Sequence, residues 1–90
     1  MQLSVIIPCL NEIDTIERCI NKCFSSFQSL KLENQAEVIV ADNGSTDGSI
    51  EAAKKAGAKV INIKKKGYGN AIIGGVEHSS GKYIVMGDAD

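Results

Sequence analysis

Short runs of apolar residues alternate along this chain with longer stretches in which apolar and polar positions are mixed. The runs at 3–9, 36–42, 58–64 and 82–88 each contain adjacent Val and Ile residues and are nearly free of charge in their centres. Continuous apolar runs of this length are typical of strands that are buried on both faces of a parallel sheet. We therefore predict four strands.

The stretches between these runs predict three helices. The first begins at Asn11, which suits the N-cap position, and its apolar positions recur every three or four residues. They form one stripe: Ile13, Ile16, Ile20, Phe24 and Phe27. The second helix covers 50–57 and ends on a glycine in the C′ position, with Asp47 as the acid best placed to cap its start. The third covers 71–80, where adjacent glycines indicate close packing against a neighbour.

Strands that alternate with helices in this way pair in parallel through right-handed crossovers. The predicted fold class is therefore α/β, with an open, mainly parallel sheet built from βα repeats, like one half of a Rossmann-type fold. In such sheets, ligands bind outside the carboxyl ends of the strands, at the point where the strand order reverses.

Polar residues gather at the ends of the predicted strands. PCLNE overlaps the end of the first strand, DNGSTD follows the second, KKKGYGN the third and DAD the fourth. The carboxyl ends of parallel strands meet at one edge of the sheet, whereas the segments that lead from a helix into a strand contain no Asp. The pattern predicts a functional site at this edge.

Composition limits the function classes. The chain has 90 residues, 43% of them hydrophobic, and a formal net charge of −1. These values suit one small domain and offer no broad basic face to nucleic acid or anionic lipid. The cysteines lack CxxC spacing and no signal peptide precedes the first run, so we expect a reducing, cytoplasmic setting. Cys19 and Cys23 are interpreted as packing residues rather than metal ligands, because no further ligand lies in register.

Four stretches together carry a family resemblance: VIIPCLNE, VIVADNGSTDGS, GYGNAIIGG and GKYIVMGDAD. They resemble the nucleotide-sugar-binding part of family 2 glycosyltransferases, which have the GT-A fold. Within this family the chain is most similar to transferases that act on polyprenyl phosphates such as dolichol phosphate. The resemblance covers nearly the whole chain and stops at the last motif. It implies that 1–90 is the donor-binding part of a domain that is truncated on its C-terminal side.

The resemblance implies sugar transfer from a UDP- or GDP-sugar to an acceptor, either a polyprenyl phosphate or a saccharide, in the synthesis of envelope polysaccharides or glycolipids. It also implies a cytoplasmic location, at a membrane surface through the part of the protein beyond residue 90. We expect the catalytic base beyond residue 90 as well, so the chain alone should bind donor without transferring sugar. An open sheet that ends at its fourth strand further predicts self-association.

Asp88 and Asp90 end the last predicted strand, and alternation places both side chains on the same side of an extended chain. Two like charges so close favour a shared cation, and carboxylate oxygens suit Mg²⁺ or Mn²⁺. The resemblance implies that Asp88 lies near the ribose and the metal, that Asp90 is the more direct ligand, and that Ala89 belongs to the donor site. The alternative is a solvated turn.

The resemblance implies that Asp42 accepts hydrogen bonds from the nucleotide base, a role that fits uracil and guanine equally. The alternative is an acid that caps the next helix or closes an Asx turn after the strand. Many relatives carry a second Asp at the next position, where this chain has Asn43. The base and ribose contacts at that position therefore stay open.

Three further positions match residues that wall the base and ribose in the family, namely Pro8, Leu10 and Glu12. Leu10 replaces an aromatic residue of many relatives, which removes a stacking face. Glu12 could accept a hydrogen bond from a ribose hydroxyl or from the base. The alternative is that it is only a charged residue in the first turn of the helix. Gly67 has no side chain, so a phosphate or a sugar could approach the backbone there, and the positive charge of Lys66 could offset that of a diphosphate. The alternative is that these residues form a plain solvated turn.

Two other functions stay open at this stage. A non-catalytic Mg²⁺-binding α/β module for nucleotides would use the same carboxylates. A receiver-type module, however, would need a pair of acids after the first strand, where this chain has Asn11 and Glu12. It would also need an Asp after the third strand, where this chain has lysines. A nucleotidyltransferase would carry a basic, Gly-rich loop after the first strand, and PCLNEID is neither basic nor Gly-rich.

Overall fold

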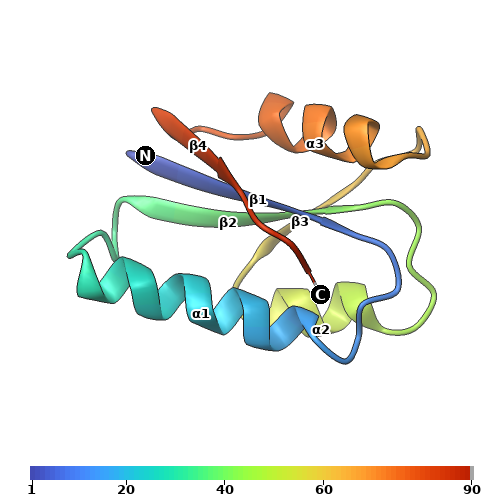
Figure 1. Ribbon diagram of the computed structural model, residues 1–90, viewed down its shortest axis with the longest axis horizontal. Helices are drawn as coiled ribbons and strands as arrows, with labels where there is room; N and C mark the ends of the chain where they lie inside the picture. The colour runs from blue at the N-terminus through green and yellow to red at the C-terminus, as the bar shows by residue number, and fades with distance from the viewer. Residues whose placement is uncertain (90) are drawn as a thin grey trace.

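Residues 1–89, which the computed structural model describes, form a four-stranded parallel sheet with helices on both faces (Figure 1). In chain order the elements are β1 (Leu3–Cys9), α1 (Ile16–Ser29), β2 (Ala36–Asp42), α2 (Ser49–Lys55), β3 (Lys59–Asn62), α3 (Tyr68–Glu77) and β4 (Tyr83–Met86). The predicted α/β class and the predicted order of strands and helices are confirmed. Among the helices of these residues, none has both the length and the hydrophobicity that crossing a membrane requires.

The strand order is β3-β2-β1-β4, and every pair is parallel. The chain moves in one direction from β1 to β3 and then returns past β1 to add β4 on its other side. Right-handed crossovers therefore place α1 and α2 on one face of the sheet and α3 on the other, as Figure 1 shows. The order reverses between β1 and β4, which is where a doubly wound sheet opens a crevice.

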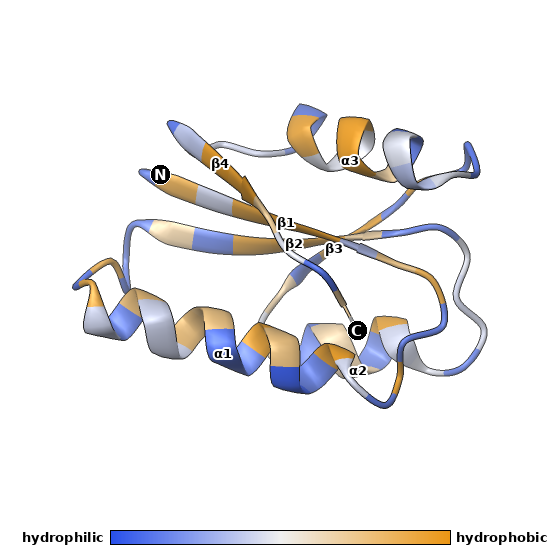
Figure 2. Ribbon diagram, in the orientation of Figure 1, coloured by the Kyte–Doolittle hydropathy of each residue, from blue (hydrophilic) through white to orange (hydrophobic). Residues whose placement is uncertain are grey.

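The side chains of β1 alternate between two apolar cores. Val5 and Ile7 belong to the core under α1 and α2, while Ile6 belongs to the core under α3. All three are at most 7% exposed. Because helices cover both faces of the strand, its sequence is a nearly continuous apolar run. Figure 2 shows hydrophobic residues concentrated along the strands between the two helix layers.

The start of α1 differs from the prediction. Asn11 does not cap the helix, which begins at Ile16 with Thr15 at the N-cap, and the side chain of Thr15 accepts no hydrogen bond from the first N–H groups of the helix. Asn11 has a φ of 54°, and its amide oxygen accepts the N–H of Thr46, so the chain makes a turn before the helix can begin. Ile13 consequently lies before the helix and is 39% exposed, whereas Ile16 is fully buried.

The end of α2 confirms the predicted glycine cap. Gly57 has a φ of 101°, a left-handed conformation that residues with a side chain rarely adopt. Its N–H donates to the carbonyl of Lys54 at 3.0 Å, and the N–H of Ala58 donates to the carbonyl of Ala53 at 3.1 Å. This pair of bonds is the Schellman pattern, which directs the chain out of α2 toward β3.

The glycines of α3 pack closely on the sheet, as the sequence predicted, although the helix begins earlier than expected, at Tyr68. A Cβ atom on Gly75 would lie 2.5 Å from Cγ2 of Ile6, and one on Gly74 would collide with the side chain of Ile63. The backbone of α3 therefore lies directly on side chains from β1 and from the segment after β3. A larger residue at either position would push the helix away from the sheet.

β4 is an edge strand that is shorter than predicted, and its four side chains are all exposed. It pairs with β1 through the register Val5 to Val85 and leaves its other edge open among the described residues. Open apolar edges promote association between chains. The expected self-association stays a prediction, and the exposure of β4 supports it.

Candidate functional site

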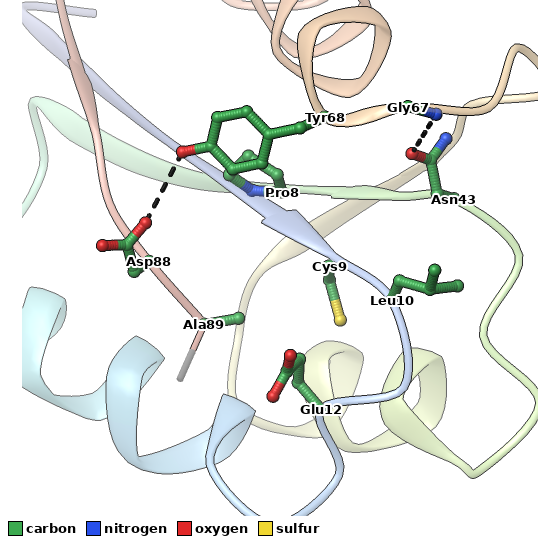
Figure 3. A pocket seen from close by; sticks show the side chains of 9 residues that line it. All are labelled: Pro8, Cys9, Leu10, Glu12, Asn43, Gly67, Tyr68, Asp88 and Ala89. Atoms are coloured by element: carbon green, nitrogen blue, oxygen red, sulfur yellow. Dashed lines mark hydrogen bonds between the residues drawn. The ribbon is translucent and has the colours of Figure 1, made fainter.

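A pocket of about 350 Å³ opens at the carboxyl ends of β1 and β4, where the strand order reverses. It is formed by the end of β1 and the residues after it, the residue after β2, the start of α3, and the residues after β4 (Figure 3). The lining residues are Pro8, Cys9, Leu10, Glu12, Asn43, Gly67, Tyr68, Asp88 and Ala89. The structure thus brings the four polar stretches together at one edge of the sheet, as the sequence predicted.

Most of the donor-binding residues predicted from the sequence line this pocket. They are Pro8, Leu10, Glu12, Gly67, Asp88 and Ala89. Asp42 and Lys66 are not among the lining residues. Asp90, the predicted second metal ligand, lies outside the described residues, so its place in the site stays a prediction.

Asp42 is fully buried and holds the loop after β2. Its Oδ2 accepts the N–H groups of Gly44 and Ser45 at 2.9 and 2.8 Å, and its Oδ1 accepts the hydroxyl of Ser45 at 2.6 Å. This arrangement is an Asx turn reinforced by a side-chain hydrogen bond. It favours the turn-closing alternative for Asp42, and the residue after β2 that lines the pocket is Asn43.

Hydrogen bonds join the loop after β1 to the loop after β2. The N–H of Asn11 donates to the hydroxyl of Ser45 at 2.8 Å, and the amide oxygen of Asn11 accepts the N–H of Thr46 at 2.8 Å. The N–H of Glu12 donates to the hydroxyl of Ser49, at the start of α2, at 2.9 Å. These bonds fix the backbone that carries the Glu12 side chain, which is half-buried and lines the pocket.

Asp47 binds the start of α2 from just outside the helix. One carboxylate oxygen accepts the N–H and the hydroxyl of Ser49 at 3.0 and 2.5 Å, and the other accepts the N–H of Ile13 at 3.1 Å. Hydrogen bonds from the hydroxyl and the N–H of Ser49 lower the pKa of Asp47, so its carboxylate is charged at neutral pH. Gly48 takes the N-cap position in a left-handed conformation, and Asp47 performs the capping that the sequence predicted.

Cys9 lines the pocket and is only 4% exposed. Burial raises the pKa of its thiol, and a hydrogen bond with the hydroxyl of Ser45, at 3.9 Å, offsets only part of the rise. The thiol is therefore protonated at neutral pH, which disfavours a role as nucleophile or metal ligand. Cys9 acts as a small apolar part of the wall.

Asp88 is the acid best placed to bind a cation in this pocket. Its carboxylate is exposed, and its Oδ1 lies 3.5 Å from the hydroxyl of Tyr68 on the facing wall (Figure 3). Within residues 1–89, no three His, Cys, Asp or Glu side chains cluster into a ready metal site. A carboxylate beside an open pocket nevertheless fits Mg²⁺ or Mn²⁺, because these ions take one or two carboxylates and complete their shells with water and phosphate.

Three residues that line the pocket were given no role from the sequence, namely Cys9, Asn43 and Tyr68, although the position of Asn43 had been noted. One signal for Asn43 was present, since an Asp followed by Gly and Ser two and three positions later is typical of an Asx turn. In that pattern the carboxylate of Asp42 binds the N–H groups of its own loop, and the side chain of Asn43 is the one that lines the pocket. Tyr68 lies inside a stretch that was predicted to contribute, but the early start of α3 that aims its ring was not foreseen.

Comparisons with known proteins agree with this geometry. The profile of the family described as Glycosyl transferase family 2 matches residues 4–90. The chain is 43% identical over 88 residues to the low-salt glycan biosynthesis hexosyltransferase of Haloferax volcanii, and the match covers 98% of this chain and 21% of that protein. It is 33% identical over 95 residues to the dolichol-phosphate mannosyltransferase of Pyrococcus furiosus, covering 100% of this chain and 26% of that protein.

Among solved structures, the fold matches glucosyl-3-phosphoglycerate synthase from Mycobacterium tuberculosis in complex with Mn²⁺, UDP and glucosyl-3-phosphoglycerate. The TM-score is 0.79 at 33% sequence identity, and the match covers 99% of this chain and 33% of that chain. The chain therefore spans about a fifth to a third of the length of the proteins that it resembles.

Proposed function

The chain belongs to glycosyl transferase family 2, and we propose from this premise that it forms the donor-binding part of an enzyme that transfers a sugar from a nucleoside diphosphate to an acceptor. One observation carries the proposal, namely the pocket at the reversal of strand order between β1 and β4, with the carboxylate of Asp88 on its wall. Parallel α/β sheets bind their ligands at this place. The pocket volume of about 350 Å³ lies within the usual range for small-molecule sites.

The end of β1 and the residues after it are proposed to bind the nucleoside. Pro8 and Leu10 give the wall an apolar surface suited to the face of a base, and Glu12 offers a carboxylate to a ribose hydroxyl. Gly67 has no side chain, so the sugar or a phosphate can approach the backbone at the start of α3. Asp42 contributes indirectly in this account, because its three hydrogen bonds hold the loop that carries the pocket residue Asn43.

Asp88 and Asp90 are proposed to hold Mg²⁺ or Mn²⁺. When bound, such an ion offsets the charge that develops on the departing nucleoside diphosphate. Tyr68 faces Asp88 across the pocket and is placed to keep this carboxylate turned toward the donor. The presence of Mn²⁺ and UDP in the similar mycobacterial enzyme supports the choice of a divalent cation and of a uridine donor, with GDP as the other candidate.

A polyprenyl phosphate is the proposed acceptor, and the name of the Pyrococcus relative, a dolichol-phosphate mannosyltransferase, supports this choice. The reaction would then take place at a membrane surface. The group that deprotonates or orients the acceptor is expected outside this chain, because the pocket carboxylates Glu12 and Asp88 have donor-side roles. The chain alone should therefore bind donor and form no glycolipid when it is supplied with labelled UDP- or GDP-sugar and polyprenyl phosphate.

The proposal is tested by thermal unfolding of the 90-residue chain with UDP, GDP, CDP or ADP, each with and without Mn²⁺. A ligand that binds only the folded state stabilises it in proportion to RT ln(1 + [L]/Kd). We expect UDP or GDP to raise the melting temperature only when Mn²⁺ is present, with EDTA reversing the rise. An equal response to all four nucleotides, or no response to any of them, would contradict the proposed function.

A further inference from the structure

The side-chain amide of Asn43 connects the end of β2 to the loop between β3 and α3, which we define as residues 63–67. We propose that Asn43 is a positioning residue, which holds this loop closed and thereby sets the part of the pocket wall formed by Gly67 and Tyr68. The consequence for donor binding rests on the proposed function, whereas the effect on the loop does not.

Both ends of the Asn43 amide bind this one loop. Its Nδ2 donates to the carbonyl oxygens of Ile63 and Lys65 at 3.1 and 3.0 Å, and its Oδ1 accepts the N–H of Gly67 at 3.2 Å. Because the N–H of Gly67 needs an acceptor, Oδ1 and not Nδ2 of Asn43 must face it. These hydrogen bonds therefore fix the orientation of the side-chain amide. Asn43 is 5% exposed, and hydrogen bonds shielded from water in this way are the more effective ones.

The backbone of Asn43 reinforces the same connection. Its carbonyl oxygen accepts a hydrogen bond from Nζ of Lys66 at 2.5 Å, and its N–H donates to the carbonyl of Cys9 at 2.9 Å. A Cβ atom on Gly44 would lie 2.5 Å from the same Nζ, so a side chain there would displace Lys66. Asn43 therefore joins β1, β2 and the loop at a single point beside the pocket.

The loop in turn aims the first residues of α3. Gly67 has a φ of 116°, a conformation that favours glycine, and it passes the chain directly into the helix at Tyr68. The amide of Asn70 donates to the carbonyl of Lys66 at 2.8 Å and closes the first turn. In Figure 3 the amide of Asn43 reaches Gly67, and the next residue carries the ring that extends toward Asp88. A displaced loop would therefore move the wall that faces the proposed cation ligand.

An aspartate at this position would not hold the loop, although it has nearly the same shape. A carboxylate can still accept the N–H of Gly67, but it has no hydrogen to donate to the two carbonyl oxygens. Those oxygens would instead face a buried negative charge, and both the lost hydrogen bonds and the unpaired charge are unfavourable. The choice of Asn over Asp at residue 43 therefore has a local structural reason.

The test compares Asn43→Asp and Asn43→Ala with Asn21→Asp, which makes the same charge change on an exposed residue of α1. Amide hydrogen exchange at Gly67 and the ring signals of Tyr68 are followed by NMR in the 90-residue chain without nucleotide. Binding of UDP with Mn²⁺ is then measured by calorimetry. We expect exchange at Gly67 to accelerate about tenfold or more in both Asn43 variants, and UDP binding to weaken about tenfold.

Asn21→Asp should change neither quantity. Unchanged exchange at Gly67 and unchanged Tyr68 signals in a folded Asn43→Asp variant would overturn the proposal, and so would a mobile loop that leaves the UDP affinity intact. If Asn43→Asp does not fold, the Asn43→Ala variant decides, because it removes the hydrogen bonds without adding charge. If the unaltered chain binds no UDP, the proposed function fails, while the exchange measurement alone still supports or overturns the role of Asn43 in the loop.

Discussion

The hydroxyl of Thr15, the N-cap residue of α1, donates a hydrogen bond to the carbonyl oxygen of Ala89, near the other end of the chain. Ala89 is 5% exposed and lies between the two proposed metal ligands, Asp88 and Asp90. The contact ties the segment after β4 to the helix that follows β1. The pocket is thus fixed at this end by a bond between parts of the chain that are far apart in sequence.

We predict that Thr15→Val weakens Mn²⁺-dependent UDP binding about fivefold, because valine has the same shape but no hydroxyl to donate to Ala89. Thr15→Ser keeps the hydroxyl and should bind UDP like the unaltered chain. Calorimetric titrations of the two variants measure the difference. Equal affinities for Thr15→Val and Thr15→Ser would show that the contact does not position the segment.

Asp42 should matter for stability more than for base recognition. Asp42→Ala removes the acceptor for three buried hydrogen bonds, so we expect the free energy of unfolding to fall by about 3 kcal/mol and the melting temperature by roughly 10 °C or more. Asp14→Ala, at an exposed acid, serves as the control and should change little. A variant at Asp42 that melts normally but binds UDP poorly would instead support direct contact with the base.

Glu37 gives the fold a pH dependence. Its Oε2 accepts hydrogen bonds from the hydroxyl of Ser4 at 2.6 Å and from the N–H and hydroxyl of Ser80 at 2.9 and 3.0 Å. Partial burial acts to raise the pKa of Glu37, but these hydrogen bonds and the charge of Lys59 outweigh it and lower the pKa. The ionised form therefore stabilises the fold above the unfolded pKa of about 4.3, and this contribution is lost as the pH falls below that value through the folded pKa.

Glu37→Gln cannot titrate, so we expect its stability to decline less between pH 5 and pH 3 than that of the unaltered chain. At neutral pH its free energy of unfolding should be lower by less than about 1 kcal/mol, because solvent screens the partly exposed carboxylate. Urea unfolding at each pH measures both quantities. Parallel loss of stability in the two proteins on acidification would show that Glu37 contributes nothing to the pH dependence.

Asp88→Asn should separate cation binding from folding. The substitution keeps the shape of an exposed side chain and removes its charge, so we expect a melting temperature close to that of the unaltered chain. Mn²⁺-dependent binding of UDP should weaken more than about tenfold, because a neutral amide is a poorer ligand for a hard cation. Glu33→Gln removes one exposed charge away from the pocket and should leave binding unchanged. Retained affinity in Asp88→Asn would remove Asp88 from the metal site.

The parts of the fold set by local pattern were predictable. The apolar runs that became β1 and β2 have their predicted bounds, because covered faces on both sides leave few polar positions within the strands. Gly57 ends α2 as predicted, since the left-handed turn there needs a glycine whatever surrounds it. The location of the pocket followed in the same way from parallel strands and a reversal of their order.

The errors came from contacts between distant segments. Asn11 has the right chemistry for an N-cap, but its amide binds Thr46 in the loop after β2, which no local pattern reveals. The base contact that the family resemblance implies for Asp42 stays a prediction, and the structure adds that its carboxylate closes the turn formed by the residues directly after it. The hydrogen bonds that Asn43 makes to the loop after β3 likewise depend on where β3 lies beside β2.

The most direct test of the account is an NMR titration of the ¹⁵N-labelled 90-residue chain with UDP and Mg²⁺, repeated with EDTA. We predict that the largest changes in amide chemical shift fall on pocket residues such as Leu10, Gly67 and Asp88, and that EDTA abolishes them. Changes centred elsewhere, for example on the groove between α1 and β4 that Phe27 and Val85 line, would contradict it. So would a spectrum that does not change at millimolar UDP with Mg²⁺ present.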